Sequence, residues 1–430
     1  MLKEAIAAAL TLLPSSWTSH VDFDRELRDL LADRAGEPAL LRAELRARGP
    51  AAAVRILAAM DEHEVPGVAL LRGARSALHG LGYDVLHASA LALDRDLVIA
   101  ALSERVRQES HPGAPRTALR LLAEIGRARD LGLAVRAATS RGAAADSHVP
   151  VALERATRLL LERDRAALAE VESRLLQGPA EVAGPLVRAT DALDPADALD
   201  WCARLVNRRS ELGALLLAQM ARIGEAHPDA VADSVRDAAR PFLGAADPAL
   251  VKQAALTAGK LEDHDALEPL IALLDHEDPG VRASAHWALK QVTGMRFPEE
   301  SRRWTAWYRA EARWFEDEAP ELFAELDAPD PRILHALNEL ARRRYQRPTL
   351  AGEVERVLDH DNARIRKMGC SVLRGIGGSA ELPALVRRLD DENPDVVREA
   401  WQALKSLTGH DTPADAAAWR EVLAARGGSR

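Results

Sequence analysis

Apolar residues return every three or four positions along most of the chain, which is the spacing of one buried face of an α-helix. Four stretches show this pattern most plainly, at 23–31, 51–60, 118–125 and 151–161. No stretch has the strict alternation that is typical of a half-buried β-strand. Glycine and proline interrupt the pattern at 36–38, 49–50, 66–67 and 110–115. The sequence therefore predicts an all-α fold, with 110–115 as the best candidate for a linker.

Five turns in the second half of the chain carry an Asp or Asn at the start of a predicted helix. Such a side chain accepts a hydrogen bond from the free N–H groups there, and proline fits the first helical position because its missing N–H would be unpaired. Successive turns are 31, 52, 31 and 32 residues apart. This spacing predicts a stacked two-helix unit, with each turn leading into the second helix. The turns are Asp247-Pro248, Asp278-Pro279, Asp330-Pro331, Asp361-Asn362 and Asn393-Pro394.

An internal repeat supports this interpretation. Residues 267–304 align without a gap to residues 382–419, at an offset of 115. Both copies end the predicted second helix with a Thr-Gly pair, and a glycine at that point can adopt the left-handed conformation that closes a helix. The identities fall at helical spacing and include Leu270 with Leu385, Val281 with Val396, Ala285 with Ala400, Leu289 with Leu404, Lys290 with Lys405 and Trp304 with Trp419.

At these residues the chain resembles HEAT-repeat proteins. The shared motif is an apolar first helix, an Asp-rich turn and then Pro-x-Val-(Arg)-x-x-Ala-x-x-Ala-Leu, present at 279–289 and 394–404 with a third, proline-less copy at 361–373. The resemblance implies an α-solenoid, a superhelix of stacked antiparallel helix pairs. The period is shorter than the roughly 40–47 residues typical of HEAT units, and is more similar to compact bacterial HEAT-like repeats. In the family a turn Asp and the following Arg form a ladder between repeats, which would involve Asp278, Arg282, Asp361 and Arg366.

The motif weakens toward the N-terminus, which predicts three regions. Residues 1–110 are expected to form an irregular N-terminal helical cap, because terminal repeats must present a polar outer face. Residues 111–210 are expected to hold degenerate helical repeats, and residues 211–430 the HEAT-like repeats. Asp194-Pro195 and His227-Pro228 are candidates for earlier, degenerate turns. The long spacing after Asp278 predicts a helical insertion at about 295–326.

This insertion is rich in aromatic residues, and positions 304, 307, 308, 311, 314 and 315 share one face of a helix. The rings either pack against adjacent repeats or anchor a partner, since Trp, Tyr and Arg dominate binding hot spots. Trp304 has a counterpart in Trp419, which indicates a structural role. The candidate partner-binding residues are therefore Trp307, Tyr308 and Trp314, with Arg303 and Arg309 beside them; Arg302 and Arg313 also flank the rings.

Composition narrows the possible functions. Apolar residues make up 47% of the chain but aromatic residues only 4%, and the net charge is −9, which disfavours a basic nucleic-acid groove. Two cysteines, Cys202 and Cys370, allow no disulfide framework, so we expect a cytoplasmic protein. The short apolar run at 1–13 lacks a signal-peptide cleavage pattern, and no run is long enough for a membrane span. The arginine-rich run at 342–347 fits the end of a helix, where cations complement the dipole, or else an anionic-partner patch.

Motifs for catalysis are absent from the sequence, including the metal-binding His-Glu-x-x-His and the phosphate loop. The His- and Asp-containing stretch 263–278 places its two histidines in turns that lie at different edges of a solenoid, so no metal site is expected. Deoxyhypusine hydroxylases of HEAT type bind iron through paired His-Glu dipeptides, whereas His63-Glu64 and His276-Glu277 here occupy non-equivalent positions.

The function predicted from the sequence is a non-catalytic protein-binding scaffold or adaptor, with no cofactor and no metal, that uses the concave face lined by the second helices. This rests on fold analogy, which does not determine function. The alternatives are a HEAT-like enzyme, similar to bilin lyases or to the metal hydroxylases, and a HEAT-like nucleic-acid-binding protein similar to the DNA glycosylases of this fold.

Overall fold

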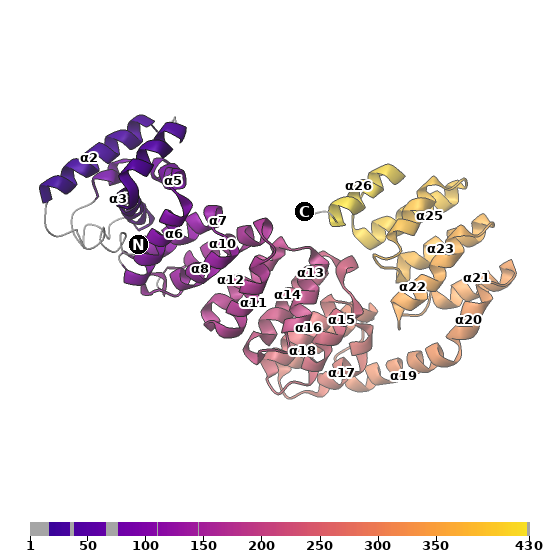
Figure 1. Cartoon of the computed structure of the whole chain (residues 1–430). Helices are drawn as coiled ribbons and strands as arrows, with labels where there is room; N and C mark the ends of the chain where they lie inside the picture. Colours follow the sequence, from indigo (N-terminus) through magenta and orange to yellow (C-terminus); the bar gives the residue numbers. More distant parts are fainter. Residues whose placement is uncertain (1–16, 35–37, 66–75, 110, 145, 428–430) are drawn as a thin grey trace. The chain divides into compact units, whose positions relative to one another are not determined.

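The computed structural model describes residues 17–34, 38–65, 76–109, 111–144 and 146–427, and all regular secondary structure in these ranges is helical (Figure 1). The predicted all-α solenoid is confirmed. The chain divides into two compact units, Met1–Leu193 and Asp194–Arg430, which are described separately. The predicted breaks at Gly36, Glu37 and 66–67, and the apolar run 1–13, lie outside the described residues.

The first unit is built around the long helix α3. This helix packs on α5, α6 and α7, and the array continues through α8 and α10 to α12. The predicted break at Gly49 is a kink inside α3, where Gly49 has a φ of +60° and Pro50 restarts the helix. The helices are α2 (Trp17–Arg34), α3 (Pro38–Glu64), α5 (Tyr83–Ala92), α6 (Arg95–Gln108), α7 (Ala114–Ile125), α8 (Leu131–Ala138), α9 (Arg141–Ala144), α10 (Val149–Arg163), α11 (Ala167–Gln177) and α12 (Ala183–Arg188).

The described part of the predicted linker, residues 111–115, is a tight corner that leads into α7 and becomes buried from Gly113 onward. Gly113 lies against the backbone of α3, and a Cβ there would fall 2.1 Å from the carbonyl oxygen of Asp61. Only glycine permits this approach without movement of α3. In the part of this segment that the structure describes, the corner belongs to the packed unit.

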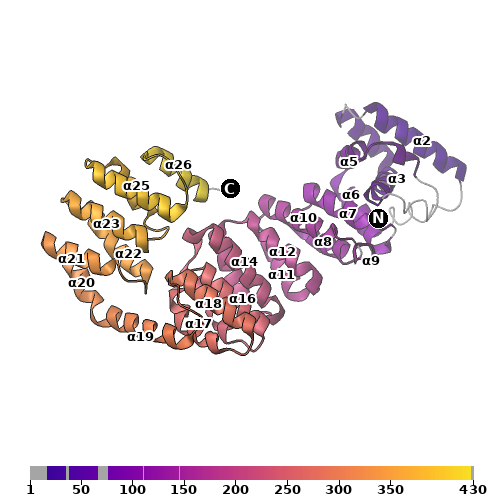
Figure 2. The same ribbon diagram turned by 180° about the vertical axis from the view of Figure 1, so that it is seen from behind.

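The second unit carries the repeats that the sequence predicts. Second helices α14, α16 and α18 pack side by side, as do α21, α23 and α25 (Figure 2). The shorter first helices precede them, and four of these, α15, α17, α22 and α24, continue directly into a 3₁₀ segment. The helices are α13 (Pro195–Leu205), α14 (Gly213–Ala226), α15 (Asp233–Ala239), α16 (Pro248–Lys260), α17 (Leu267–Ala272), α18 (Pro279–Thr293), α19 (Ser301–Asp317), α20 (Ala319–Glu325), α21 (Asp330–Leu340), α22 (Arg347–Glu355), α23 (Ala363–Ile376), α24 (Leu382–Arg387), α25 (Pro394–Thr408) and α26 (Ala416–Gly427).

The caps of the second helices follow the predicted turns with two corrections. Asp247, Asp278 and Asn393 cap α16, α18 and α25 by accepting hydrogen bonds from backbone N–H groups, as expected. The helix α21 begins at Asp330 itself, so this Asp does not cap it. In the proline-less turn, Asn362 caps α23 and the preceding Asp361 does not.

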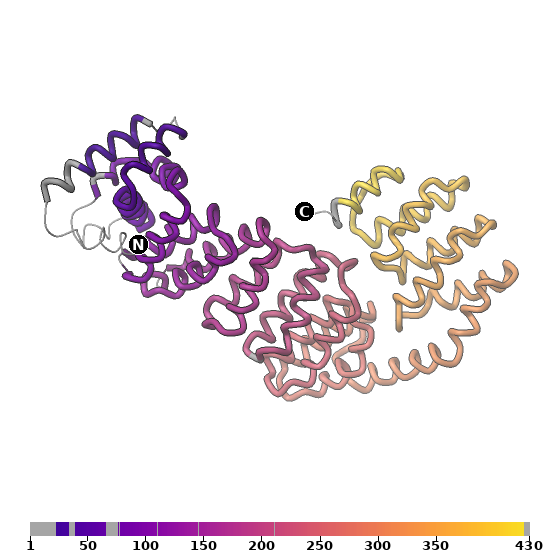
Figure 3. Tube along the Cα trace, in the orientation of Figure 1, coloured from indigo at the N-terminus to yellow at the C-terminus, as the bar shows by residue number. Residues whose placement is uncertain are grey.

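The internal repeat is visible in the core and at the helix ends. Val281, Ala285 and Leu289 of α18 are fully buried, as are their counterparts in α25, Val396, Ala400 and Leu404. Both helices close on a left-handed glycine, with φ of +71° at Gly294 and +73° at Gly409. Where α18 leads into α19 and then α20, the chain inserts an extra helix before the next pair (Figure 3). None of the helices in the described ranges is both long and apolar enough to cross a membrane.

Candidate functional site

The helix α19 and the corner before it form the most distinctive surface of the second unit. The helix packs on α17 and on α20. Its inward face carries large rings and its outward face carries arginines, because seventeen residues of amphipathic sequence present one stripe to the core. We call this surface the α19 surface, defined by Lys290, Arg296, Phe297, Arg302, Arg303, Trp307, Tyr308, Arg309 and Arg313.

Trp304 is part of the core of this region. Its side chain is fully buried, and its indole N–H donates a 3.0 Å hydrogen bond to the carbonyl oxygen of Pro298. Phe297 packs edge-on against it, with ring centroids 5.1 Å apart. The counterpart Trp419 is also fully buried, so the aligned pair shares a buried environment.

Trp307 and Tyr308 are only partly buried. The Trp307 ring lies edge-on to Trp304, with centroids 5.9 Å apart, and to Phe297 at 6.3 Å. Tyr308 packs edge-on against Tyr345, with centroids 5.6 Å apart. Burial and the neighbouring Tyr345 raise the pKa of Tyr308 to about 12, so its hydroxyl is a hydrogen-bond donor and not an anion at neutral pH. Both side chains keep part of their surface available.

Trp314 lies in a different environment. Its side chain is 4% exposed, and the guanidinium carbon of Arg343 stands 3.9 Å above its ring centroid. Arg343 also pairs with Glu311 at 3.1 Å, so the cation is held in place from both sides. This stacked, desolvated arrangement is a cation–π contact. Trp314 is covered by the chain's own residues, and we leave it out of the α19 surface.

The arginine-rich run at 342–347 lies in the turn beyond α21, which ends at Leu340. These cations are engaged within the second unit. Arg342 pairs with Glu339 at 2.8 Å, and Arg344 donates to the carbonyl oxygen of Ala341 at 3.0 Å. Arg347 reaches Glu262 at 3.5 Å. The run therefore holds its own turn in place and offers few free charges to an anionic partner.

The arginines of α19 differ from this run. Arg302, Arg303, Arg309 and Arg313 are exposed, and in the part of the chain that the structure describes none of them forms an ion pair with a carboxylate. The guanidinium carbon of Arg303 lies 5.1 Å from the ring centroid of Phe297. Both predicted arginines, Arg303 and Arg309, therefore lie on the α19 surface with Trp307 and Tyr308.

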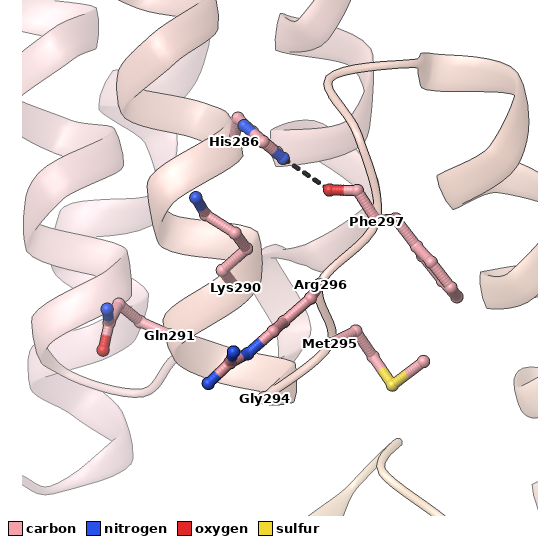
Figure 4. A pocket seen from close by; sticks show the side chains of 7 residues that line it. All are labelled: His286, Lys290, Gln291, Gly294, Met295, Arg296 and Phe297. Atoms are coloured by element: carbon pink, nitrogen blue, oxygen red, sulfur yellow. Dashed lines mark hydrogen bonds between the residues drawn. The ribbon is translucent and has the colours of Figure 1, made fainter.

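A pocket of about 560 Å³ opens at the corner between α18 and α19 (Figure 4). Lys290 and Gln291 come from the last turn of α18, and Met295 and Arg296 come from the loop that follows. The corner is fixed by His286, whose Nε2 donates a 2.8 Å hydrogen bond to the carbonyl oxygen of Phe297. The walls thus combine two cations with apolar side chains. Sequence reasoning did not single out this pocket.

The match to a family model concerns the same unit. A family model described as HEAT repeats matches residues 200–290 and 319–405. These two segments match HEAT repeats, the family that the sequence motif resembles. The stretch between the two matches contains α19. No curated protein matches the chain. Among solved structures, an engineered protein is similar at 16% identity over 94% of this chain and 98% of its own, with a TM-score of 0.29.

Within the HEAT repeats, the ladder arginines act on the turns. Arg282 donates to the carbonyl oxygen of His276 at 2.8 Å, and Arg366 donates in the same way to the carbonyl oxygen of His360 at 2.9 Å. Asp278 contributes its carboxylate to the cap of α18. Asp361 contributes only its carbonyl oxygen, which accepts from Arg366 at 2.8 Å.

Asp391 links its turn to Arg366 of the preceding repeat. Nε and Nη2 of Arg366 each donate a 2.8 Å hydrogen bond to its carboxylate. Burial alone would raise the pKa of Asp391, but the hydrogen bonds from Arg366 and the backbone N–H of Asn393 hold it below its ordinary value. Arg282 has no such partner in the next turn, because the insertion follows; it lies 3.4 Å from Glu299 instead.

The stretch 263–278 of the HEAT array is used structurally. Asp263 binds Arg240 at 2.8 Å, and His276 accepts a 3.0 Å hydrogen bond from the backbone N–H of Asp278. His264 is 6% exposed; burial, with Arg347 and Arg236 nearby, lowers its pKa to about 3. Across the described ranges, no three His, Cys, Asp or Glu side chains gather in a way that could hold a metal ion.

Proposed function

We propose that this chain is a non-catalytic protein-binding scaffold and that the α19 surface is its docking site. HEAT repeats commonly mediate protein interactions, and this array carries an extra helix between its two matched segments. The observation that carries the proposal is that the partly buried Trp307 lies beside exposed arginines that form no ion pair with any carboxylate of the described residues. An aromatic ring flanked by arginines is the composition of a binding hot spot.

The arginines support docking because most other arginines of the described array are already engaged. Arg356, for example, reaches Asp327 at 2.7 Å, and Arg420 reaches Asp390 at 3.2 Å. Arg302, Arg309 and Arg313 are exposed, so a carboxylate of the partner does not have to displace a carboxylate of this chain. Electrostatic complementarity at such a rim speeds association. The second helices would extend the contact surface, and we propose the cytoplasm as the compartment because a chain with two cysteines has no disulfide framework.

The test compares partner recovery by variants of the whole chain. Affinity capture with quantitative proteomics should lose the specific partner with Trp307→Ala and with Arg309→Glu. The control is Val151→Ala, because Val151 is the most exposed large apolar side chain, 66% exposed, and lies in the first unit. Urea unfolding first verifies that Trp307→Ala is folded. Equal recovery by Trp307→Ala, Arg309→Glu and the unaltered chain would overturn the proposal.

A further inference from the structure

The pocket between α18 and α19 has a matched corner elsewhere in the same chain, at the end of α25. The two corners have the same backbone conformation, because both helices end on a left-handed glycine. In each corner the residue after the glycine donates its N–H to the hydroxyl of the threonine before it: Met295 to Thr293 at 3.1 Å, and His410 to Thr408 at 3.2 Å. The internal repeat thus supplies a control for side-chain differences.

One further bond is also matched. The ring nitrogen of His286 donates to the carbonyl oxygen of Phe297 at 2.8 Å, and at the aligned position the indole N–H of Trp401 donates to the carbonyl oxygen of Thr412 at 2.7 Å. Each bond ties the second helix to the loop eleven residues later. The two loops therefore leave their helices in the same way, and side chains at aligned positions face equivalent space.

The charges in the two corners differ. Lys405 at the end of α25 pairs with the carboxylate of Asp411 and lies 4.6 Å above the Trp401 ring. In the pocket, the equivalent lysine is Lys290, and the position equivalent to Asp411 is Arg296. The position that holds a carboxylate beside the lysine in one corner therefore holds a second cation in the other corner.

Neighbouring positions increase this difference. Arg302 and Arg303 align with Ala417 and Ala418, so the start of α19 carries two cations where the other copy has alanine. The first corner also has one extra carboxylate, Glu299, where the other copy has Ala414. This carboxylate lies 3.4 Å from Arg282 and 4.0 Å from His286. The pocket keeps an excess of positive charge that the same fold neutralises internally in its other copy.

We infer that the pocket bounded by Lys290 and Arg296 receives an acidic peptide segment, whose carboxylate takes the place that Asp411 holds beside Lys405. This inference rests on the proposed function and names the chemistry of the partner. Charge-assisted hydrogen bonds from Lys290 and Arg296 would hold the carboxylate. Met295 and Phe297 offer apolar surface to the neighbouring residues of the peptide.

A protein carboxylate fits better than a nucleic acid. The chain has a net charge of −9, which repels a long polyanion beyond the range of one local patch. The pocket is a single concavity of about 560 Å³ and not a groove that follows a phosphate backbone. The size suits one or two side chains of an extended segment.

The experiment measures fluorescence anisotropy of a labelled peptide in which glutamates alternate with leucine and alanine, at low salt because screening weakens exposed charge contacts. The full-length chain should bind this peptide and should not bind the matched peptide with glutamine for glutamate. Arg296→Asp, which reproduces the charge of the matched corner, should weaken binding about ten- to hundred-fold, as expected when a hydrogen bond to a charged group is replaced by repulsion. Lys290→Gln should weaken it in the same direction.

The control variant is Arg332→Asp, which changes the net charge by the same amount at an exposed residue of α21 and should leave peptide affinity unchanged. Equal affinity for both peptides, or for Arg296→Asp and the unaltered chain, would overturn the inference. So would tighter binding of a labelled single-stranded oligonucleotide that is lost with Arg296→Asp, or full competition by inorganic phosphate. If peptide binding fails while Trp307-dependent partner recovery persists, the inference fails and the proposed function stands.

Discussion

Arg366 and Asp391 form a bidentate ion pair between neighbouring repeats, with both N–H···O distances at 2.8 Å. The two side chains are 7% and 3% exposed. Because the same guanidinium also donates to two turn carbonyls of its own repeat, the pair fixes one turn against the next. Removing one partner of such a buried pair destabilises the fold strongly, because the other charge then stays buried without a counter-charge.

Asp391→Asn should therefore lower the free energy of unfolding by about 1.5–3 kcal/mol, the range for hydrogen bonds to charged groups. The measurement is urea unfolding. The exposed pair of Arg420 with Asp390 provides the control, with side chains 61% and 66% exposed. Arg420→Met should change stability by less than about 1 kcal/mol. Equal losses in the two variants would contradict the assignment.

The same pair has a pH signature. Its contribution is fully present above the unfolded pKa of Asp, about 3.9, because the folded pKa of Asp391 is lowered. The contribution is lost as the pH falls through the folded pKa. The stability difference between the unaltered chain and Asp391→Asn should thus stay constant at neutral pH and shrink below about pH 4. A difference that grows on acidification would contradict this.

Buried His264 should make the free energy of unfolding depend on pH under milder acidity than Asp391 does. Its folded pKa is lowered to about 3, so the unfolded chain takes up a proton first and stability falls as the pH drops below about 6.5. Neither ring nitrogen has a hydrogen-bond partner among the described residues. Between about pH 6.5 and pH 5 the loss should reach about 2 kcal/mol, and His264→Leu should remove it. Unfolding at both pH values measures this; identical losses would exclude His264 as the cause.

The close approach of α16 and α18 depends on Gly259. A Cβ there would lie 2.6 Å from Cζ3 of Trp287 and 2.9 Å from the Cα of Ala288. Gly259→Ala should destabilise the second unit by about 1–3 kcal/mol through overpacking. Gly352→Ala in α22 meets no atom within 4 Å and should be neutral or stabilising by up to about 1 kcal/mol. Urea unfolding separates the two, and equal changes would show that helix propensity alone governs both.

Substitution of Trp314 should lower stability far more than substitution of Trp307, which we assign to binding. Trp314→Ala removes a buried ring and its contact with Arg343, so unfolding free energy should fall by about 3–5 kcal/mol. Trp307→Ala, at a partly exposed ring, should cost clearly less. Thermal or urea unfolding of both variants checks this order, and the reverse order would remove Trp307 from the α19 surface.

Local patterns in the sequence determined much of the fold. Apolar spacing predicted the helices, and the caps at Asp247, Asp278 and Asn393 followed because capping depends on residues two or three positions away. The offset of 115 predicted the matched corners at Gly294 and Gly409. These features are short-range, and neighbouring repeats contact one another in chain order.

Only the tertiary structure decided which predicted side chains remain accessible. Trp307 and Trp314 lie on the same predicted helix face, yet Trp314 is covered by Arg343, which arrives from the turn beyond α21. The carboxylate partner of Arg366 is Asp391 in the next turn, a choice that depends on how repeats stack. The contrast between Lys290 beside Arg296 and Lys405 beside Asp411 was present in the alignment. Only the structure shows that matched hydrogen bonds hold both corners in the same geometry, so that the two pairs can be compared. This could not be read from the alignment, because charge pairing depends on distance in space and not along the chain.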